Sequence, residues 1–226
     1  MLHAEAITVA RGRHVLARDL SLRVCAGELV HVAGPNGCGK TSLLRALAGV
    51  VEPRRGSVIR AAPCWFVPER LELPPRLRAG RFLRLSGAAD ASLDDAQRRC
   101  GELSKGRLQL VALAGALEYA RRGPALLVLD EPWAGLDAAA RAGLGAELAA
   151  AAERGSAVIF TDHSGDGTLR ATRTIGIGTD GGGAPPARVR IELARGADTK
   201  AVVVSDPALA ARLAAGWTVR DAAPLP

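Results

Sequence analysis

The sequence predicts an α/β fold with a largely parallel sheet and a smaller antiparallel sheet near the N-terminus. Short apolar runs, typical of buried strands, alternate with segments of helical periodicity along most of the chain. One strand–helix junction carries a glycine-rich loop that ends in Lys-Thr. Residues 2–9 and 14–24 are rich in Val, Leu and Ile and are separated only by Arg11-Gly12-Arg13, which favours an antiparallel pair.

The remaining elements follow from the same patterns. A helix is expected to begin at Lys40 and to end near Gly49, before Pro53. Longer helices are expected at 103–120 and 138–154. Short strands are expected at 29–33, 57–60, 64–67, 125–129, 157–161 and 172–177, of which the last three are predicted to be buried.

The chain is predicted to form one domain, 1–226, with internal divisions. Residues 1–68 and 119–180 are expected to form the core, and 69–118, rich in Arg, Leu and Pro, a short helical subdomain. Residues 185–226 follow a Gly- and Pro-rich linker and are expected to form a small C-terminal extension. In that extension we expect strands at 188–193, 202–204 and 217–220 and a helix at 207–215.

The composition excludes several classes of protein. A chain of 226 residues with 48% hydrophobic and 23% charged residues is globular rather than disordered or fibrous. It has no apolar run of 18 residues and no visible secretory signal. We therefore expect neither a membrane-spanning helix nor secretion of the protein. The four cysteines form no C-x-x-C pair, which argues against a zinc site and favours the reducing cytoplasm.

The net charge of +7 is a weak signal for a nucleic-acid partner. Only Lys40, Lys105 and Lys200 are lysines among the 30 cationic residues, so the charge is mostly scattered arginine, which we attribute to composition. A basic face can attract nucleic acid or anionic lipid. Aromatic residues make up only 3% of the chain and leave little on which bases could stack. We expect no nucleic-acid partner.

A phosphate-binding loop is predicted between the strand at 29–33 and the helix that begins at Lys40. Residues 34–41 satisfy the pattern G-x-x-x-x-G-K-[ST] in the strand–loop–helix setting that it requires. Glycines let backbone N–H groups surround phosphate oxygens, and the helix N-terminus adds partial positive charge. Lys40 is expected to neutralise the β- and γ-phosphates, and the Thr41 hydroxyl to ligate Mg²⁺. The loop residues predicted to bind nucleotide are Gly34, Pro35, Asn36, Gly37, Cys38, Gly39, Lys40, Thr41 and Ser42.

An acidic pair follows a later apolar strand. Residues 126–129 lead directly into Asp130 and Glu131. Asp130 is expected to join the Mg²⁺ sphere, and Glu131 to polarise a water toward the γ-phosphate as general base. Taken alone, a strand that ends in two acids also fits a capped turn; together with the phosphate loop, the functional interpretation is favoured.

Four further motifs resemble those of the ATP-binding-cassette (ABC) ATPases. Residues 130–137, Asp-Glu-Pro-Trp-Ala-Gly-Leu-Asp, look like the family's acidic strand end and D-loop, and 103–107, Leu-Ser-Lys-Gly-Arg, are similar to its signature. Residues 158–163 resemble the strand that leads to the switch histidine, and 65–69 the strand that enters the Q-loop. The resemblance covers roughly residues 5–178. It implies a P-loop NTPase fold with a RecA-like core.

The resemblance also implies a mechanism in which two subunits sandwich two ATP molecules head to tail. The Ser104 hydroxyl and the Gly106 N–H would then bind the γ-phosphate held by the other subunit. His163 would contact the γ-phosphate and hold the attacking water with Glu131, and Asp137 would cross the dimer interface. The expected catalytic residues are Lys40, Glu131 and His163.

The sequence departs from the family pattern in the signature and near the Mg²⁺ site. Glu69 stands where glutamine is usual, and its carboxylate needs Mg²⁺ or an arginine to offset repulsion from phosphate. We assign it to the nucleotide and metal site, so the predicted Mg²⁺ ligands are Thr41, Asp130 and Glu69. Lys105 and Arg107 replace the first Gly and the Gln of the signature, and we expect binding in trans to survive at an altered rate.

Two departures affect aromatic positions. The family's adenine-stacking aromatic falls near Arg11, whose guanidinium plane can stack on a base. His14 is the alternative, and a plain solvent-exposed turn fits about as well. Trp133 stands where a small hydroxyl residue is usual, and nothing in the sequence explains it.

The resemblance implies an ATPase subunit that binds ATP and Mg²⁺, pairs with a second ABC ATPase subunit and powers separately encoded integral membrane subunits. Residues 70–85 would form the groove for the membrane partner, unless their leucines are ordinary core. We expect a cytoplasmic protein, peripheral on the inner face of the cell membrane, with export as the favoured direction. The alternatives are a soluble ABC ATPase without a transport role and a catalytically weak regulatory cassette with a degenerate signature.

Overall fold

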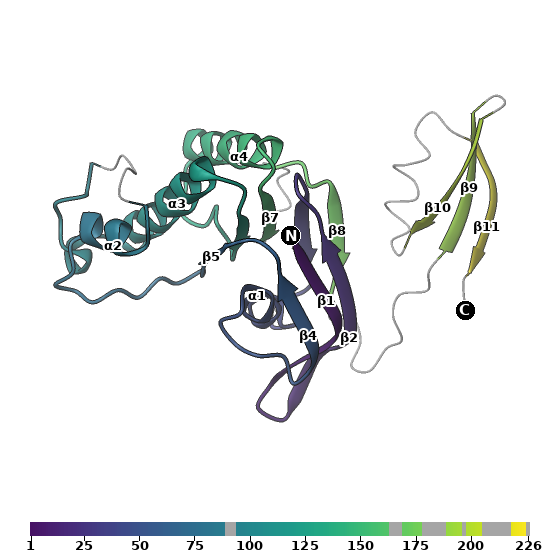
Figure 1. The fold of residues 1–226 in the computed structure, drawn as a ribbon, viewed down its shortest axis with the longest axis horizontal. Coiled ribbons are helices and arrows are strands. Elements are labelled where there is room, and N and C mark those ends of the chain that lie inside the picture. The colour runs from purple at the N-terminus through teal and green to yellow at the C-terminus, as the bar shows by residue number, and fades with distance from the viewer. Residues whose placement is uncertain (89–93, 163–168, 178–188, 196–197, 205–217, 225–226) are drawn as a thin grey trace. The chain divides into compact units, whose positions relative to one another are not determined.

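The computed structural model describes residues 1–88, 94–162, 169–177, 189–195, 198–204 and 218–224, the last three as backbone only. The chain divides into two units, Met1–Thr179 and Asp180–Pro226 (Figure 1). Among the described residues, no helix is both long and apolar enough to cross a membrane. The finer division of the chain that the sequence suggested stays a prediction.

The centre of the first unit is a parallel sheet of five strands. Its order is β5(Cys64–Val67), β6(Leu126–Leu129), β7(Ala157–Thr161), β3(Leu29–Ala33) and β8(Arg173–Gly176). β6 and β7 are buried along their whole length, as their continuous apolar runs predict. β8 was expected to be buried as well, and this expectation was wrong: β8 is an edge strand whose residues alternate between half-buried and exposed.

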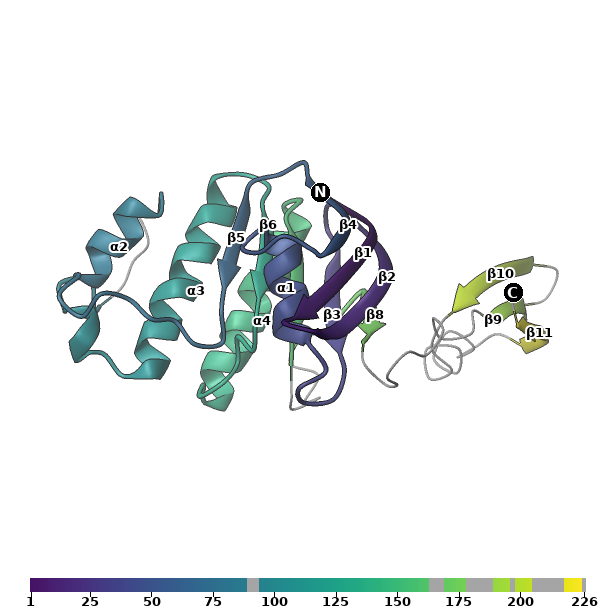
Figure 2. The ribbon, with the colours of Figure 1, turned by 90° about the horizontal axis from the view of Figure 1, so that it is seen from below.

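An antiparallel sheet of three strands lies beside the parallel one. β1(Leu2–Arg11) pairs with β2(His14–Val24), as the sequence predicts, and its other edge pairs with β4(Arg55–Arg60). α1(Lys40–Ala48) packs between the two sheets (Figure 2), because Leu43, Leu44 and Leu47 meet apolar side chains of both. Full burial of such leucines contributes about 1.5–3 kcal/mol each.

Two long helices cover the opposite face of the parallel sheet (Figure 1). They are α3(Lys105–Arg122) and α4(Ala138–Glu153), and both share one apolar cluster with β6 and β7. The N-terminus of α4 is capped by Asp137, whose Oδ1 accepts a hydrogen bond of 2.8 Å from the Ala140 N–H. The sheet is therefore enclosed between helices, which confirms the predicted α/β class.

The segment between β5 and α3 contains less helix than the sequence suggested. Its described residues form only α2(Ala79–Leu85) and the 3₁₀ turn η1(Cys100–Glu102). Backbone hydrogen bonds instead join residues 75–80 to residues 96–101, and their distances from N to O are 2.7–3.0 Å. Gly80 permits this pairing, because a Cβ there would lie 2.9 Å from the Ala96 carbonyl oxygen.

The second unit contains an antiparallel sheet in the order β10(Asp198–Val204), β9(Val189–Arg195), β11(Thr218–Pro224). These strands occur near the three positions that the sequence predicts, and each is longer than expected. The helix expected at 207–215 lies outside the described residues.

Candidate nucleotide-binding site

The loop between β3 and α1 follows a backbone path that requires glycine at two positions. Gly39 precedes α1 with φ 108°, and a Cβ there would lie 2.7 Å from the Leu16 Cβ. Gly34 has φ 159°, close to extended backbone, but an added Cβ would lie 2.4 Å from the Ile177 carbonyl oxygen and 2.7 Å from the Cys38 Sγ. Packing alone therefore accounts for glycine at these two positions.

The loop ends at a helix N-terminus that suits an anion. α1 has no side-chain cap and no acidic residue in its first turn, so its first N–H groups have no competing acceptor there. Lys40 is only 7% exposed. Its Nζ donates hydrogen bonds to the carbonyl oxygens of Gly34, at 2.7 Å, and Pro35, at 3.2 Å. These bonds hold the ammonium group across the loop.

The acidic pair after β6 is held by a residue of the neighbouring strand. The Thr161 hydroxyl, fully buried at the end of β7, donates to Asp130 Oδ1 at 2.8 Å and accepts from the Glu131 N–H at 2.9 Å. Glu131 has φ 51°, a left-handed conformation that is uncommon for residues other than glycine. The hydroxyl therefore fixes one oxygen of Asp130 and the strained backbone of Glu131 together.

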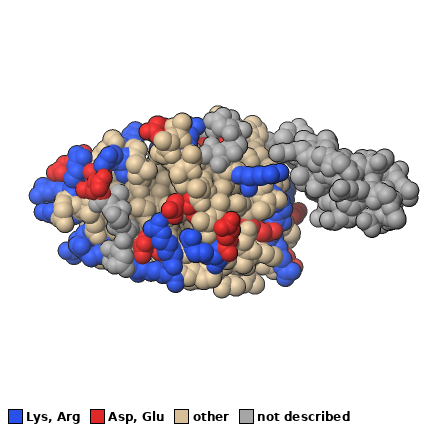
Figure 3. All heavy atoms as spheres, turned by 90° about the horizontal axis from the view of Figure 1, so that it is seen from above, with Lys and Arg blue, Asp and Glu red and all other residues tan. Residues whose placement is uncertain are grey.

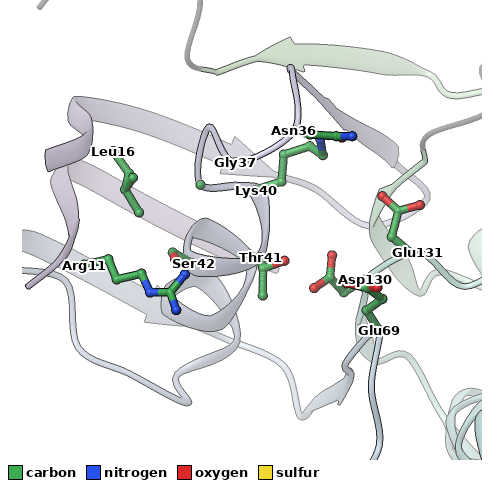
Figure 4. Close-up of a pocket in the computed structure, with 11 residues that line it drawn as sticks. Arg11, Leu16, Asn36, Gly37, Lys40, Thr41, Ser42, Glu69, Asp130 and Glu131 are labelled. Atoms are coloured by element: carbon green, nitrogen blue, oxygen red, sulfur yellow. The ribbon is translucent and has the colours of Figure 1, made fainter. Parts of the chain in front are cut away.

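The phosphate loop with Lys40 and the acidic pair after β6 border one pocket of about 220 Å³ (Figure 4). Arg11 and Ser42 lie at one end of the view, Lys40 and Thr41 in the middle, and the acidic residues at the other end. The lining residues are Arg11, Leu16, Asn36, Gly37, Gly39, Lys40, Thr41, Ser42, Glu69, Asp130 and Glu131. The structure thus brings together residues of β1, β2, the loop, α1 and the segments that follow β5 and β6, and most of them are residues that the sequence motifs predict.

The acidic end fits a hydrated Mg²⁺ ion. Asp130 Oδ2 is buried and has no hydrogen-bond partner among the described residues, so this oxygen is available as a ligand. The pocket adds Thr41 and the Glu69 carboxylate, and hard oxygen donors of this kind suit Mg²⁺. Glu69 is the most exposed of the three, with its side chain 47% exposed and 4.0 Å from the Arg70 Nε. The Arg70 side chain is 80% exposed, so it offsets little of the charge of Glu69, which leaves Mg²⁺ as the partner that suits this carboxylate.

Several predicted site residues lie outside this pocket. Gly34, Pro35 and Cys38 belong to the loop but do not line the pocket. His14 does not line the pocket either, so Arg11 is the base-stacking candidate that the structure places there. Ser104, Gly106 and Asp137 are absent from the lining, and their predicted role at a dimer interface stays a prediction. His163 lies outside the described residues.

Two residues near the site, Thr161 and His31, were not identified from the sequence, and a third, Trp133, had no explanation there. Thr161 lies in an apolar run, where a single hydroxyl gives little signal. Trp133 is 3% exposed and packs edge-on against Phe160, with ring centroids 5.1 Å apart, so it is a core residue. His31 stacks on the same phenyl ring at 5.2 Å. Burial lowers the pKa of His31; the Asp162 carboxylate and backbone oppose this shift, and Lys40 adds to it.

Comparison with known proteins supports the same assignment. The family model for ABC transporters matches residues 17–134. The chain belongs to the ABC transporter family. The cytochrome c biogenesis ATP-binding export protein CcmA of Novosphingobium aromaticivorans is 38% identical over 185 residues, which cover 78% of this chain and 95% of that protein. The zinc import ATP-binding protein ZnuC of Roseobacter denitrificans is 38% identical over 152 residues, or 61% of this chain and 58% of that protein.

The fold of this ABC ATPase is also that of solved cassettes. A dimeric ATP-binding cassette, MJ0796, in a post-hydrolysis state with ADP and Pi matches with a TM-score of 0.66 at 22% identity and covers 79% of this chain and 94% of that one. The predicted P-loop NTPase fold is therefore confirmed. The residue-by-residue roles in the ABC ATPase stay predictions.

Proposed function

We propose that this ABC ATPase binds ATP with Mg²⁺ in the described pocket, dimerises around two ATP molecules and hydrolyses them to power a separately encoded membrane transporter. The observation that supports this most is the pocket itself. It combines a helix N-terminus and Lys40, which follow β3, with Asp130 and Glu131, which follow β6 on the far side of β7. Phosphoryl transfer needs a cationic phosphate cradle next to metal ligands and a base.

Each residue of the pocket has a role that follows from its position. Lys40 and the N–H groups of the loop bind the phosphates, and Arg11 stacks on the base at the far end. Thr41, Asp130 and Glu69 hold Mg²⁺, which neutralises charge on the phosphates when bound. Glu131 accepts the proton of the attacking water. His163, which lies outside the described residues, is assigned to the same step on the family resemblance alone.

The second half of each ATP site comes from the partner subunit. Ser104 is exposed and caps α3, and a Cβ added at Gly106 would meet no atom within 4 Å, so this helix end faces open space. Its first turn can approach the γ-phosphate of a second subunit as an N-terminal anion site. Loss of that phosphate on hydrolysis removes the bridge and opens the dimer.

The direction of transport that we favour is export. The CcmA relative, described as an export protein, is aligned over 95% of its length, whereas the ZnuC relative, described as an import protein, is aligned over 58%. Docking on membrane subunits would place the protein on the cytoplasmic face of the cell membrane. A mutant strain that loses zinc uptake while export stays intact would contradict this direction.

Glu131→Gln tests the catalytic half of the proposal. The amide cannot accept the proton of water, so turnover should fall about 10²–10⁴-fold. ATP binding should be retained, and the ATP-bound dimer should accumulate in size-exclusion chromatography. Equal turnover by the wild-type and variant proteins would contradict the proposal, and no turnover in the wild type with its membrane subunits would favour the regulatory cassette.

Ser104→Arg tests the dimer. The bulky cation should block approach of the partner's phosphate, so ATP-dependent dimerisation should be lost in the Glu131→Gln background while monomer ATP binding stays intact. Persistent dimerisation would contradict the sandwich.

Purification from membranes tests the partner: co-purification of an integral membrane protein supports transport, and recovery only from the soluble fraction favours the soluble ABC ATPase.

A further inference from the structure

An ion cluster outside the ATP pocket holds the start of α3. The Asp95 side chain is only 5% exposed and lies between two arginines. Its Oδ2 accepts from the Arg107 Nε, and its Oδ1 lies 3.4 Å from the Arg98 Nη1. The Arg107 hydrogen bond holds the pKa of Asp95 below its usual range, so the carboxylate is charged at neutral pH. Arg107 comes from the first turn of α3, whereas Asp95 and Arg98 come from the loop before it.

Arg107 also takes part in the helix cap that orients Ser104. Its backbone N–H donates to the Ser104 Oγ at 3.3 Å. An oxygen that accepts this bond still has its own O–H to donate. One residue therefore joins the N-cap of α3 to the buried carboxylate.

The loop on the other side of the cluster is itself firmly held. The Arg98 N–H donates to the Asp95 carbonyl oxygen at 2.9 Å, and the Arg98 Nη2 donates to the Glu102 carbonyl oxygen at 3.0 Å. The same loop pairs by backbone hydrogen bonds with residues 75–80, which follow Glu69 along the chain. The cluster thus connects the first turn of α3 to a segment that leaves the ATP pocket.

A direct phosphate contact is the competing role for Arg107. Exposed arginines are common at the end of the first unit that carries α2 (Figure 3), so position and charge alone do not distinguish it. What does distinguish it is the buried acid that its guanidinium already binds, which Arg107 shares with Arg98. Lys105, by contrast, is exposed and forms no ion pair with the described residues.

We propose that Arg107 is a positioning residue: with Asp95 and Arg98 it fixes the first turn of α3 so that Ser104 and Gly106 present their donors to the ATP of the second subunit. This inference rests on the proposed function. It also explains how the signature accommodates arginine where the family pattern has glutamine, because the longer side chain reaches a partner on the preceding loop.

The test measures ATP-dependent dimerisation in the Glu131→Gln background. Arg107→Met keeps the aliphatic stem and removes the guanidinium, and Asp95→Asn removes the charge of its partner. Each should weaken dimerisation about tenfold, and the double variant should be no weaker than the single ones, because both remove one coupled interaction. Monomer ATP affinity should not change. Arg81→Met, at an exposed position on α2, is the matched control and should have no effect.

The outcomes separate this inference from the proposed function. If the Glu131→Gln parent does not dimerise with ATP, the proposed function fails and this inference fails with it. If the parent dimerises and Asp95→Asn dimerises as well or better, Arg107 acts directly on phosphate and only the inference is overturned. Should a single variant fail to fold, the exchanged pair Asp95→Arg with Arg107→Asp decides: a folded exchange variant that dimerises supports positioning, and any other result overturns it.

Discussion

The two halves of the proposed ATP site are built by different means. The phosphate-loop half lies at the ends of buried strands, where Lys40 is 7% exposed, Asp130 1% and Thr161 fully buried. The signature half lies at the start of α3, where Ser104 and Arg107 are exposed and are held by a helix cap and an ion cluster.

This difference bears on how each half tolerates change. A group at the end of a buried strand is fixed by the whole sheet, so moving it disturbs the core. An exposed helix start depends on a few side-chain contacts, each worth little by itself, and can exchange them. The departures at Lys105 and Arg107 lie in the second half. In the first half the loop at 34–41 keeps the full phosphate-binding pattern, and the departures at Arg11 and Glu69 fall on exposed residues of the pocket lining.

Among the contrasts between the two halves, the largest is expected for two lysines, one in each half. Lys40→Ala removes a buried cation from the phosphates, and turnover should fall about 10²–10³-fold together with monomer ATP affinity. Lys105→Ala is the matched control. It should leave monomer ATP affinity unchanged and affect only dimerisation, because the proposed dimer brings its charge to the ATP of the partner subunit. Titration with a fluorescent ATP analogue measures the monomer ATP affinity of both variants. Equal loss of that affinity in the two variants would contradict the division into two halves.

A smaller effect is expected at Thr161, which sharpens the argument about buried strand ends. Thr161→Val keeps the shape but leaves Asp130 Oδ1 and the Glu131 N–H without their partner, which should cost about 1–3 kcal/mol of stability. The Mg²⁺ concentration for half-maximal turnover should also rise, because Asp130 loses its fixed orientation. Urea unfolding and a Mg²⁺ titration measure these changes. Thr161→Ser should restore both; if it does not, the hydroxyl is not responsible.

The phosphate-loop half could be predicted from sequence because its signals are local. The pattern at 34–41 and the apolar run before Asp130 each lie within ten residues, and the fold places both at one sheet edge as parallel strands must. The sequence did not predict Thr161, because its two partners are 30 and 31 residues away. It could not explain Trp133 for the same reason, since Phe160 comes from another strand.

The signature half was less predictable. Leucine and arginine between residues 70 and 85 suggested helices, but backbone pairing with residues 96–101 competes with helix formation there. The partner of Arg107 also lies before the helix, so the helical periodicity of α3 carries no information about it. The exposed edge strand β8 has a similar cause, because its burial depends on which strand lies beside it.

The smallest expected effect is a pH dependence at His31, which lies in β3, the strand that precedes the phosphate loop. Burial lowers its pKa, so the folded protein favours the neutral ring, whereas the unfolded chain takes up a proton near the ordinary value of about 6.5. The resulting stability is fully present above that value and is lost as the pH falls through the lowered pKa. His31→Phe keeps a ring against Phe160 but cannot titrate. It should therefore lose less stability than the wild type between pH 8 and pH 5.5 in urea unfolding, whereas His3→Gln, at an exposed position, should behave like the wild type. If all three proteins show the same pH dependence, burial does not hold His31 neutral in the fold.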